Sequence, residues 1–397
     1  MNSSIFNSEL ITELLPNAIQ KSLDDYSHLG ILNTDLIVAP FFMVALAVVL
    51  MVYIKKKRWH FRLPVYLFLC IVIGRLLLWN NPVAWYVYYK TLDWKDVGSR
   101  QVTVMADQVS RYFSPSDKLK YLAVGSSQTG AVYSKYAKKN EHLYKVQFSG
   151  MGPVEYFLHR GMVDRLEPEY VLLYLSEFDL GRKPNYSTFR YAPFQGTELY
   201  NYGNLILSYD DSDSAYTALK EIVLGNIFSE YRFSFIYKGY LKKLLDYNNA
   251  FASARNSERT DTDNELKPNQ ARSLNHLSSE YIGLSLAAIK YFLRYCHEYN
   301  TKVIIVEGQY HPDAYSENNN KLNEISTAGL RKISQEHANT FFIPKEALPP
   351  LSVDDYRDIY HVSDKRGEQH ATNILTYIKN NIEVDSTPAS YTVSEEN

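Results

Sequence analysis

A turn of small residues in the first half of the chain has the composition of an acyl-transfer site. Gly125-Ser126-Ser127 lies between a short apolar segment and a helix-compatible run. At such a junction the turn exposes a serine hydroxyl, and the first backbone N–H groups of the helix point toward any oxyanion that forms there. The pattern predicts a serine nucleophile, and the alternative is that Ser126 or Ser127 only caps the helix.

A second motif, Asp358-x-x-His361, lies near the end of the sequence. A serine hydroxyl is a poor nucleophile unless an imidazole accepts its proton and a carboxylate fixes the imidazole tautomer. Asp358 and His361 are one turn apart, so they can hydrogen-bond to each other while the histidine faces the serine. The chain contains ten histidines, and an ordinary surface loop is the alternative. The two motifs together favour catalysis, because one follows the first predicted strand and the other precedes the last predicted helix.

The region that contains both motifs alternates short apolar segments with amphipathic ones. Strands are predicted over 119–125, 144–149, 170–176, 302–307 and 340–343. Helices are predicted over 128–139, 154–162, 282–293, 321–337 and 371–378. Repeated β-α units of this kind predict an α/β fold, a flavodoxin-like three-layer sandwich with a mostly parallel central sheet. The loops after the carboxyl ends of such strands are where sites are built.

Two apolar runs precede this region. Residues 36–54 carry no charge and reach roughly 28 Å as a helix, which matches a bilayer core of ~30 Å. Residues 63–79 form the second run, broken only by Arg75, and the loop between the runs holds five Lys and Arg. The positive-inside bias predicts a cytoplasmic loop, with both the N-terminus and everything after Trp79 outside. A buried core hairpin is the alternative, and a cleaved signal peptide is disfavoured because no basic region precedes residue 36.

About a hundred residues rich in Tyr and Phe interrupt the alternation. We predict a helical part near 214–247 and a polar stretch over 252–272, with the aromatic side chains forming a local core or stacking on sugar rings. The predicted organisation is an extracytoplasmic segment over 1–35, a transmembrane hairpin over 36–79, a connector over 80–117, an α/β domain over 118–380 with an insertion at 180–277, and a disordered tail over 381–397.

The overall composition excludes several classes of protein. The 42 Lys and Arg against 44 Asp and Glu give a net charge of −2, which disfavours a nucleic-acid partner. Two cysteines exclude a disulfide-stapled fold. No zinc spacing, phosphate-binding glycine loop or dinucleotide fingerprint is present, so we expect neither a metal nor a cofactor. Two aspartate-rich stretches, at 210–213 and 261–265, are predicted to be solvated loops rather than calcium sites.

Residues after the fourth predicted strand are candidates for contact with a substrate. Gln309 and His311 follow a buried segment and would lie at the same edge of the sheet as the serine turn. The two residues could therefore line the pocket and bind substrate, and a plain turn is the alternative.

Three motifs resemble those of the SGNH (GDSL-like) hydrolase and acyltransferase superfamily: Gly125-Ser126-Ser127 after the first strand, Ser149-Gly150-Met151-Gly152 after the second, and Asp358-x-x-His361 before the last helix. The resemblance implies that Ser127 is the nucleophile, His361 the general base and Asp358 its orienting partner. It also implies an oxyanion hole formed by the N–H of Ser127 and that of Gly150 or Gly152.

The resemblance covers residues 118–182 and 278–380, with two departures. The third motif of the superfamily, Gly-x-Asn-Asp, is replaced by Ser-Glu-Phe-Asp at 176–179, so the Asn that completes the oxyanion hole is missing. The glycine after the histidine is six residues on, at Gly367, where the superfamily usually has five.

With an outward-facing domain on a membrane anchor, the chain is most similar to the branch that contains the D-alanyl transfer protein of teichoic acids and the alginate O-acetylation proteins. The similarity implies a serine acyltransferase on a bacterial cytoplasmic (inner) membrane, with its C-terminal domain extracytoplasmic. Such an enzyme would pass an acetyl or similar group to a cell-surface polysaccharide and would receive it from a multi-spanning membrane acyltransferase. A carbohydrate esterase of the same fold, or a non-catalytic subunit of a polysaccharide assembly complex, is the alternative.

Overall fold

The computed structural model describes residues 82–110, 119–192, 196–227, 229–249, 277–314 and 317–383. The hairpin predicted over 36–79, the segment 1–35 before it and the polar stretch 252–272 lie outside the described residues, as does the tail from residue 384. Among the helices that are described, none combines the length and the apolar composition that crossing a bilayer requires.

The chain forms two compact units. Of the described residues, the α/β unit comprises 119–186, 197–216, 277–314 and 317–383. The helical unit comprises 82–110, 187–192, 196, 217–227 and 229–249. Residues of the predicted insertion are therefore divided between the two units, and the described part of the predicted connector belongs to the helical unit.

A five-stranded sheet forms the centre of the α/β unit. Its strands are β1 (Tyr121–Gly125), β2 (Leu143–Gln147), β3 (Tyr170–Leu175), β4 (Lys302–Glu307) and β5 (Thr340–Ile343). All are parallel, in the order β2-β1-β3-β4-β5, which is one of the common orders of doubly wound sheets. The prediction of an α/β fold with a parallel central sheet is confirmed. Gly125 pairs with Gln147 and Leu175 with Glu307, so the carboxyl ends of these strands share one edge.

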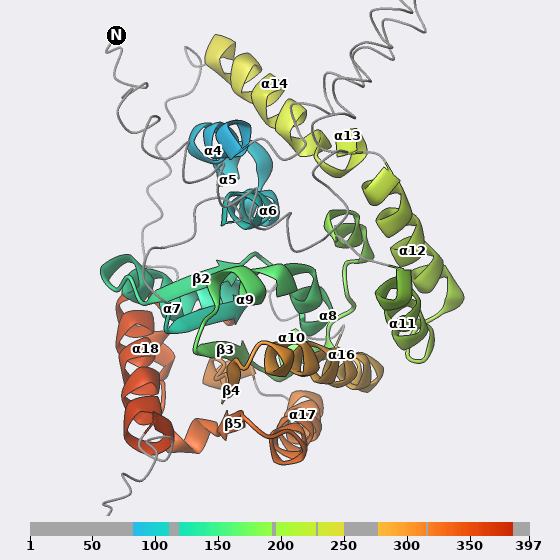
Figure 1. Ribbon diagram of the computed structural model, residues 1–397. Coiled ribbons are helices and arrows are strands. Elements are labelled where there is room, and N and C mark those ends of the chain that lie inside the picture. Colours follow the sequence, from blue (N-terminus) through green and yellow to red (C-terminus); the bar gives the residue numbers. More distant parts are fainter. Residues whose placement is uncertain are drawn as a thin grey trace, which may run out of the picture. The chain divides into compact units, whose positions relative to one another are not determined.

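Helices cover both faces of the sheet (Figure 1). One face is covered by α7 (Ser127–Lys139) and α18 (Asp364–Ile378), and the other by α8 (Pro153–Tyr156), α9 (Arg160–Leu166), α16 (Ser279–Glu298) and α17 (Glu317–Glu336). Successive residues of β3 point to opposite faces: Leu172 packs with Ala371 of α18, and Leu173 packs with Ile289 of α16. Because both faces are covered, every residue of β3 is buried, as its apolar sequence predicts.

Shorter elements complete the α/β unit. They are α10 (Glu177–Gly181), α11 (Gly196–Leu207), the first residues of α12 (Ser212–Ile227), the 3-10 turns η2 (Phe157–His159), η4 (Pro312–Ala314), η5 (Lys345–Ala347) and η6 (Val353–Asp355), and the π-turn η7 (Lys379–Glu383). Within the insertion, α11 is anchored by Tyr202, whose ring stacks on Phe157 at 5.2 Å and whose hydroxyl donates to the carbonyl of Val154. This part of the insertion therefore belongs to the core of the α/β unit.

The helical unit is built around aromatic side chains. It contains α4 (Pro82–Thr91), α5 (Trp94–Val97), α6 (Ser99–Ser110), most of η3 (Tyr186–Tyr191) and of α12, α13 (Ser229–Arg232) and α14 (Ser234–Asn249). Trp85 meets Phe233 edge-to-face at 4.8 Å, and Met105, Phe235 and Ile236 complete the buried cluster. The helical part predicted near 214–247 corresponds to α12, α13 and α14.

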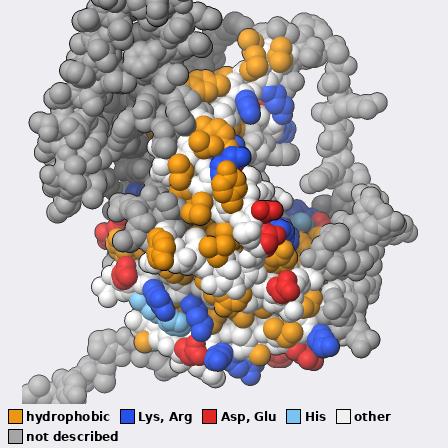
Figure 2. Space-filling model, turned by 90° about the vertical axis from the view of Figure 1, so that its right-hand side faces the viewer, with side chains coloured by type: hydrophobic (Ala, Val, Ile, Leu, Met, Phe, Trp, Pro, Cys, Tyr) orange, Lys and Arg blue, Asp and Glu red, His pale blue; other side chains and the backbone are white. Residues whose placement is uncertain are grey.

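Large apolar side chains remain exposed on the helices between residues 200 and 245. Nine of the thirteen exposed large hydrophobic residues in the described part of the chain lie there: Tyr200, Leu207, Tyr209, Tyr216, Val223, Tyr237, Leu241, Leu244 and Leu245. Figure 2 shows hydrophobic side chains, with Lys and Arg among them, on one face of the molecule. Other aromatic residues of the insertion, such as Phe189 and Tyr202, are buried, so the insertion both packs a core and presents apolar surface.

Candidate active site

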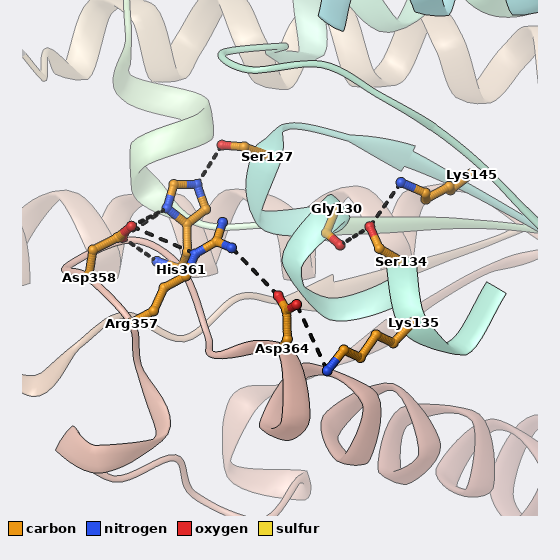
Figure 3. Close-up of polar contacts among 9 residues, drawn as sticks. All are labelled: Ser127, Gly130, Ser134, Lys135, Lys145, Arg357, Asp358, His361 and Asp364. Carbon is orange, nitrogen blue, oxygen red and sulfur yellow. Dashed lines mark hydrogen bonds and ion pairs between the residues drawn. The ribbon is translucent and has the colours of Figure 1, made fainter. Parts of the chain in front are cut away.

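Ser127, His361 and Asp358 form a hydrogen-bonded relay (Figure 3). The Oγ of Ser127 lies 2.7 Å from Nε2 of His361. The Nδ1 of His361 lies 2.8 and 2.9 Å from the two carboxylate oxygens of Asp358. When Nδ1 carries the proton and its N–H donates a hydrogen bond to Asp358, Nε2 is free to accept the proton of the serine hydroxyl. The structure thus brings together the three residues that the two motifs contain, with the roles that general-base catalysis requires.

The two serines of the turn do different things. Ser126 is the N-cap of α7, and its Oγ accepts from the backbone N–H of Gln128 at 3.2 Å. Ser127 is the first residue of the helix, and its side chain is only partly buried. Ser126 therefore caps the helix, and the Ser127 hydroxyl remains available to His361, with its role as a nucleophile still a prediction.

Close packing of α18 on α7 places the histidine against the serine, since His361 lies just before α18 and Ser127 begins α7. The contact is closest at Gly367, where a Cβ atom would overlap the carbonyl oxygen of Ala131 on α7. A side chain at this position would force the two helices apart. Gly367 therefore sets how closely the His361 loop approaches Ser127.

Charged side chains also join the two helices and the loop before α18. Asp364, at the start of α18, lies 3.9 Å from Nζ of Lys135 on α7 and 3.6 Å from Nη1 of Arg357 (Figure 3). Farther along, Lys139 of α7 pairs with Glu368 of α18. These pairs are partly exposed, so each contributes little to stability, but together they hold the loop that carries Asp358 beside α7.

The Asp358 carboxylate is fixed by its own loop. Its Oδ1 accepts the backbone N–H groups of Tyr360 and His361, both at 2.9 Å. Burial alone would raise the pKa of Asp358, but its hydrogen bonds with His361 and Tyr360 and the His361 charge hold it below its ordinary value. Asp358 is therefore a carboxylate at neutral pH and holds His361 in the tautomer that leaves Nε2 open.

The backbone amides predicted to form an oxyanion hole differ in how they are engaged. The N–H of Ser127 belongs to the first turn of α7 and so has no intrahelical acceptor. Gly150 follows β2 with a φ of +78°, a left-handed conformation that favours glycine. The N–H of Gly152, by contrast, donates to Oε2 of Glu155 at 2.7 Å. The amide of Gly152 is therefore engaged within the protein, and of the predicted alternatives the structure favours Gly150 beside Ser127; the oxyanion hole itself stays a prediction.

Residues at the end of β3 form hydrogen bonds that connect this strand to the serine turn. Asp179, which stands at the last position of the altered third motif, accepts from the N–H and the Oγ of Ser176 at 3.2 and 2.8 Å. The Oγ of Ser176 also lies 2.6 Å from the hydroxyl of Tyr310. Burial raises the pKa of Asp179, although hydrogen bonds from Ser126 and Ser176 oppose the shift. Asp179 thus ties the residue next to Ser127 to the neighbouring strand.

Gln309 and His311 make contacts with the loop that precedes Asp358. The side-chain oxygen of Gln309 accepts from the backbone N–H of Leu351 at 3.1 Å. His311 is buried and meets the ring of Tyr356 edge-to-face at 5.5 Å. These contacts give both residues a part in holding the loop, and their role in binding substrate stays a prediction.

The aspartate-rich stretch at 210–213 is part of a helix start. Asp210 accepts from the hydroxyl of Tyr186 at 2.6 Å, and Asp211 accepts from the N–H of Ser214 at 2.6 Å. Among the described residues, no three His, Cys, Asp or Glu side chains are grouped so that they could hold a metal ion. The stretch at 261–265 lies outside the described residues.

From the sequence, Gly367 and the motif that ends in Asp179 were named only as departures from the superfamily pattern, with no role assigned to them. Arg182 was missed, because no pattern pointed to it. No protein-family model and no curated protein matches the chain. The resemblance to the SGNH superfamily therefore depends on the residues themselves and stays a proposal.

Proposed function

We propose that this protein is a membrane-anchored serine acyltransferase that esterifies a hydroxyl group of a cell-surface polysaccharide, with O-acetylation as the preferred reaction. The observation that carries the proposal is the continuous relay from Ser127 through His361 to Asp358, with each link at 2.7 to 2.9 Å. These distances are those of hydrogen bonds that can pass a proton to a base. The relay starts at a helix N-terminus, where backbone donors favour a developing oxyanion.

The reaction would proceed in two steps through one intermediate. In the first, the Oγ of Ser127 forms a bond to the carbonyl carbon of the acyl donor, its proton passes to Nε2 of His361, and the leaving group departs with that proton. In the second, a sugar hydroxyl attacks the acyl-serine, His361 accepts the proton of the sugar, and Ser127 recovers a proton as its ester bond breaks. Asp358 stabilises the imidazolium that exists between the proton transfers.

The proposed surroundings follow from the resemblance and from the apolar runs over 36–79. These runs would anchor the protein in a bacterial cytoplasmic membrane, with the α/β unit on the extracytoplasmic side. A multi-spanning membrane acyltransferase would deliver the acyl group there, and a polysaccharide would accept it. The exposed tyrosines of the insertion, such as Tyr200 and Tyr216, are candidates for contact with sugar rings.

A serine-directed fluorophosphonate probe tests the relay in the full-length protein in detergent. Wild type should be labelled and Ser127→Ala should not, with circular dichroism showing that the variant remains folded. Ser134→Ala is the matched control, because Ser134 lies on the same helix but bonds to Lys145 at 2.9 Å, so this variant should be labelled like wild type. Equal labelling of wild type and Ser127→Ala would contradict the proposal.

Transfer and hydrolysis are separated by an acceptor experiment. The same protein is incubated with an activated acetyl ester, with and without a polysaccharide acceptor, and both free acetate and acetylated sugar are measured. Acetyl-sugar that depends on Ser127 supports the transferase, whereas acetate alone favours the esterase. If a folded wild type is neither labelled nor active, the non-catalytic subunit is favoured, an outcome that Phe178 in place of the Asn donor would explain.

A further inference from the structure

Arg182 holds its guanidinium group over the backbone of Gly150. Two of its nitrogens, Nη1 and Nη2, lie 2.8 and 2.9 Å from the point where a Cβ of Gly150 would be. The charged group also lies over the ring of Phe178, at 5.5 Å from its centroid. Because glycine has no side chain there, the guanidinium reaches a backbone turn that the superfamily resemblance places in the oxyanion hole.

The guanidinium has no ion-pair partner among the described residues. Asp179 is close enough for its carboxylate to be affected by the charge of Arg182, but its oxygens are directed to Ser176. A partly buried guanidinium carries five donors and keeps its charge at any physiological pH. A guanidinium whose donors are not paired with a carboxylate is suited to an anion that arrives or forms beside it.

Contacts connect Arg182 to the catalytic relay. The ring of Phe178 lies against that of Tyr360 at 4.7 Å, and Tyr360 meets His361 at 6.2 Å. On the other side, Asp179 bonds to Ser126, the neighbour of the nucleophile. Arg182 therefore belongs to the wall of the site that Gly150 and Phe178 form.

The predicted oxyanion hole is short of hydrogen-bond donors, and Arg182 can take the place of a missing one. The amide of Gly152 is occupied by Glu155, and Phe178, at the position of the superfamily's Asn, has no donor. We propose that Arg182 supplies the missing donor and stabilises the negative charge on the acyl carbonyl oxygen as the Ser127 Oγ bonds to the carbonyl carbon. The proposal rests on the proposed acyl-serine chemistry. Arg182 keeps its protons throughout, and the charge returns to the carbonyl when the leaving group departs.

Hydrolysis of p-nitrophenyl acetate by the full-length protein tests this role, because the ester is neutral and an arginine that only binds acidic substrates would not affect it. Arg182→Gln should lower kcat about 100-fold with KM nearly unchanged, since an oxyanion donor acts in the transition state. Arg182→Lys should recover part of the loss. Arg331→Gln is the matched control: Arg331 lies over Phe342 at 5.8 Å on α17, and its loss should not change kcat.

Several outcomes would overturn the role of Arg182. A folded Arg182→Gln with kcat within twofold of wild type excludes it, and a rise in KM alone assigns Arg182 to substrate binding instead. If hydrolysis by wild type does not depend on Ser127, the proposed function itself fails, and that result is distinct from either outcome for Arg182.

A second inference concerns α14 and stands on separate observations. One side of this helix packs on α5 and α4, where Gly239 meets Val97 and the hydroxyl of Tyr240 lies 2.6 Å from Oγ1 of Thr91. The opposite side exposes a stripe at positions i, i+4, i+7 and i+8, with exposed fractions of 45 to 62%: Tyr237, Leu241, Leu244 and Leu245. Three lysines lie in the same helix: Lys242 and Lys243 donate to the backbone carbonyls of Lys95 and Thr91, and Lys238 is exposed.

We propose that this stripe lies in the headgroup region of an anionic bilayer. An apolar stripe with an exposed cation beside it, here Lys238, is the pattern of a helix that lies in the plane of a membrane surface. The predicted membrane run ends at Trp79, and α4 begins at Pro82. Tyr240 of α14 contacts Tyr88 and Thr91 of α4, which ties α14 within a short distance of the bilayer. The inference rests on the proposed anchor.

Lipid quenching tests the placement in the full chain, reconstituted into nanodiscs that contain phosphatidylglycerol. A fluorophore is attached at Leu244→Cys in a Cys70→Ala background, in which the fully buried Cys296 stays unlabelled. Lipids with brominated acyl chains should quench it, and a label at Ile325→Cys, which is also exposed but lies on α17, should not be quenched. Equal quenching at both positions, or none at position 244, contradicts the placement. Failure of the protein to enter nanodiscs would instead refute the anchor.

Discussion

The two units of the molecule are organised by different physical means. In the α/β unit the strand ends carry polar side chains that are held at fixed distances by hydrogen bonds, as in the network of Ser176, Asp179 and Tyr310. In the helical unit the centre is a cluster of aromatic rings around Trp85 and Phe233, and apolar side chains remain on its surface. The comparison indicates that hydrogen bonds, which are directional, position the residues of the candidate site. Apolar packing, which is not directional, stabilises the helical unit, which is proposed to lie near the membrane.

The largest expected effect separates the two units. Phe233→Ala removes a buried ring that meets Trp85 at 4.8 Å, and a cavity of this kind costs about 3–5 kcal/mol. We expect the helical unit to lose much of its stability while fluorophosphonate labelling of Ser127 persists, because the relay lies wholly within the α/β unit. Hydrogen exchange, read by mass spectrometry, measures the stability of the helical unit over residues 82–110 and that of the α/β unit over residues 121–175. Equal loss of protection in the two regions would show that the units do not fold separately.

A smaller effect is expected from a substitution at the contact of α7 with α18. This substitution should lower activity and leave the stability of the helical unit unchanged. Gly367→Ala adds a methyl group that would overlap the carbonyl oxygen of Ala131, so α18 must shift and carry His361 away from Ser127. A misplacement of about 1 Å costs on the order of 100-fold in rate. We therefore expect kcat for an activated ester to fall by about that factor. Ala371→Gly, elsewhere on α18, creates no such overlap and is the control; its rate should stay closer to that of wild type.

Much of the fold could be predicted from the sequence because the strands are short apolar runs buried on both faces. The predicted segment 302–307 and the observed β4 coincide, and the predicted 170–176 exceeds β3 by one residue. The helix α11 was missed, because its aromatic and polar residues show no clear periodicity until Tyr202 is seen to pack on Phe157. Local patterns therefore identified the sheet, and long-range packing determined the insertion.

The candidate site could be predicted in part, because some of its residues lie at the starts of helices. Ser127 stands where a strand ends and a helix begins, and His361 stands just before the last long helix; both helix starts are visible in the sequence. The engagement of the Gly152 amide by Glu155 and the position of Arg182 over Gly150 depend on how loops from two strands fold against each other. Neither arrangement follows from spacing along the chain.

The smallest effect that we predict concerns Glu177, which is buried beside the site. Burial raises its pKa from the ordinary value of 4.5 to about 7, although a hydrogen bond from Asn323 and the charge of Lys345 oppose the shift. The folded protein therefore keeps a proton on Glu177 that the unfolded chain has lost between about pH 4.5 and 7. Because the native state binds more protons in this window, stability falls as pH rises through it, by at most about 3 kcal/mol, and the loss is complete above pH 7.

Glu177→Gln should remove this dependence, since glutamine keeps the shape of the protonated side chain but does not titrate. Urea unfolding at several pH values measures the difference in unfolding free energy between wild type and variant, and groups common to both cancel. We expect the difference to change in favour of the variant from pH 4.5 to 7 and to level off above it. Glu324→Gln, exposed on the same helix as Asn323, should show no such change. A flat difference for Glu177→Gln would mean that its carboxyl is charged in the folded protein, and the polar core beneath the relay would then be better solvated than the aromatic core of the helical unit.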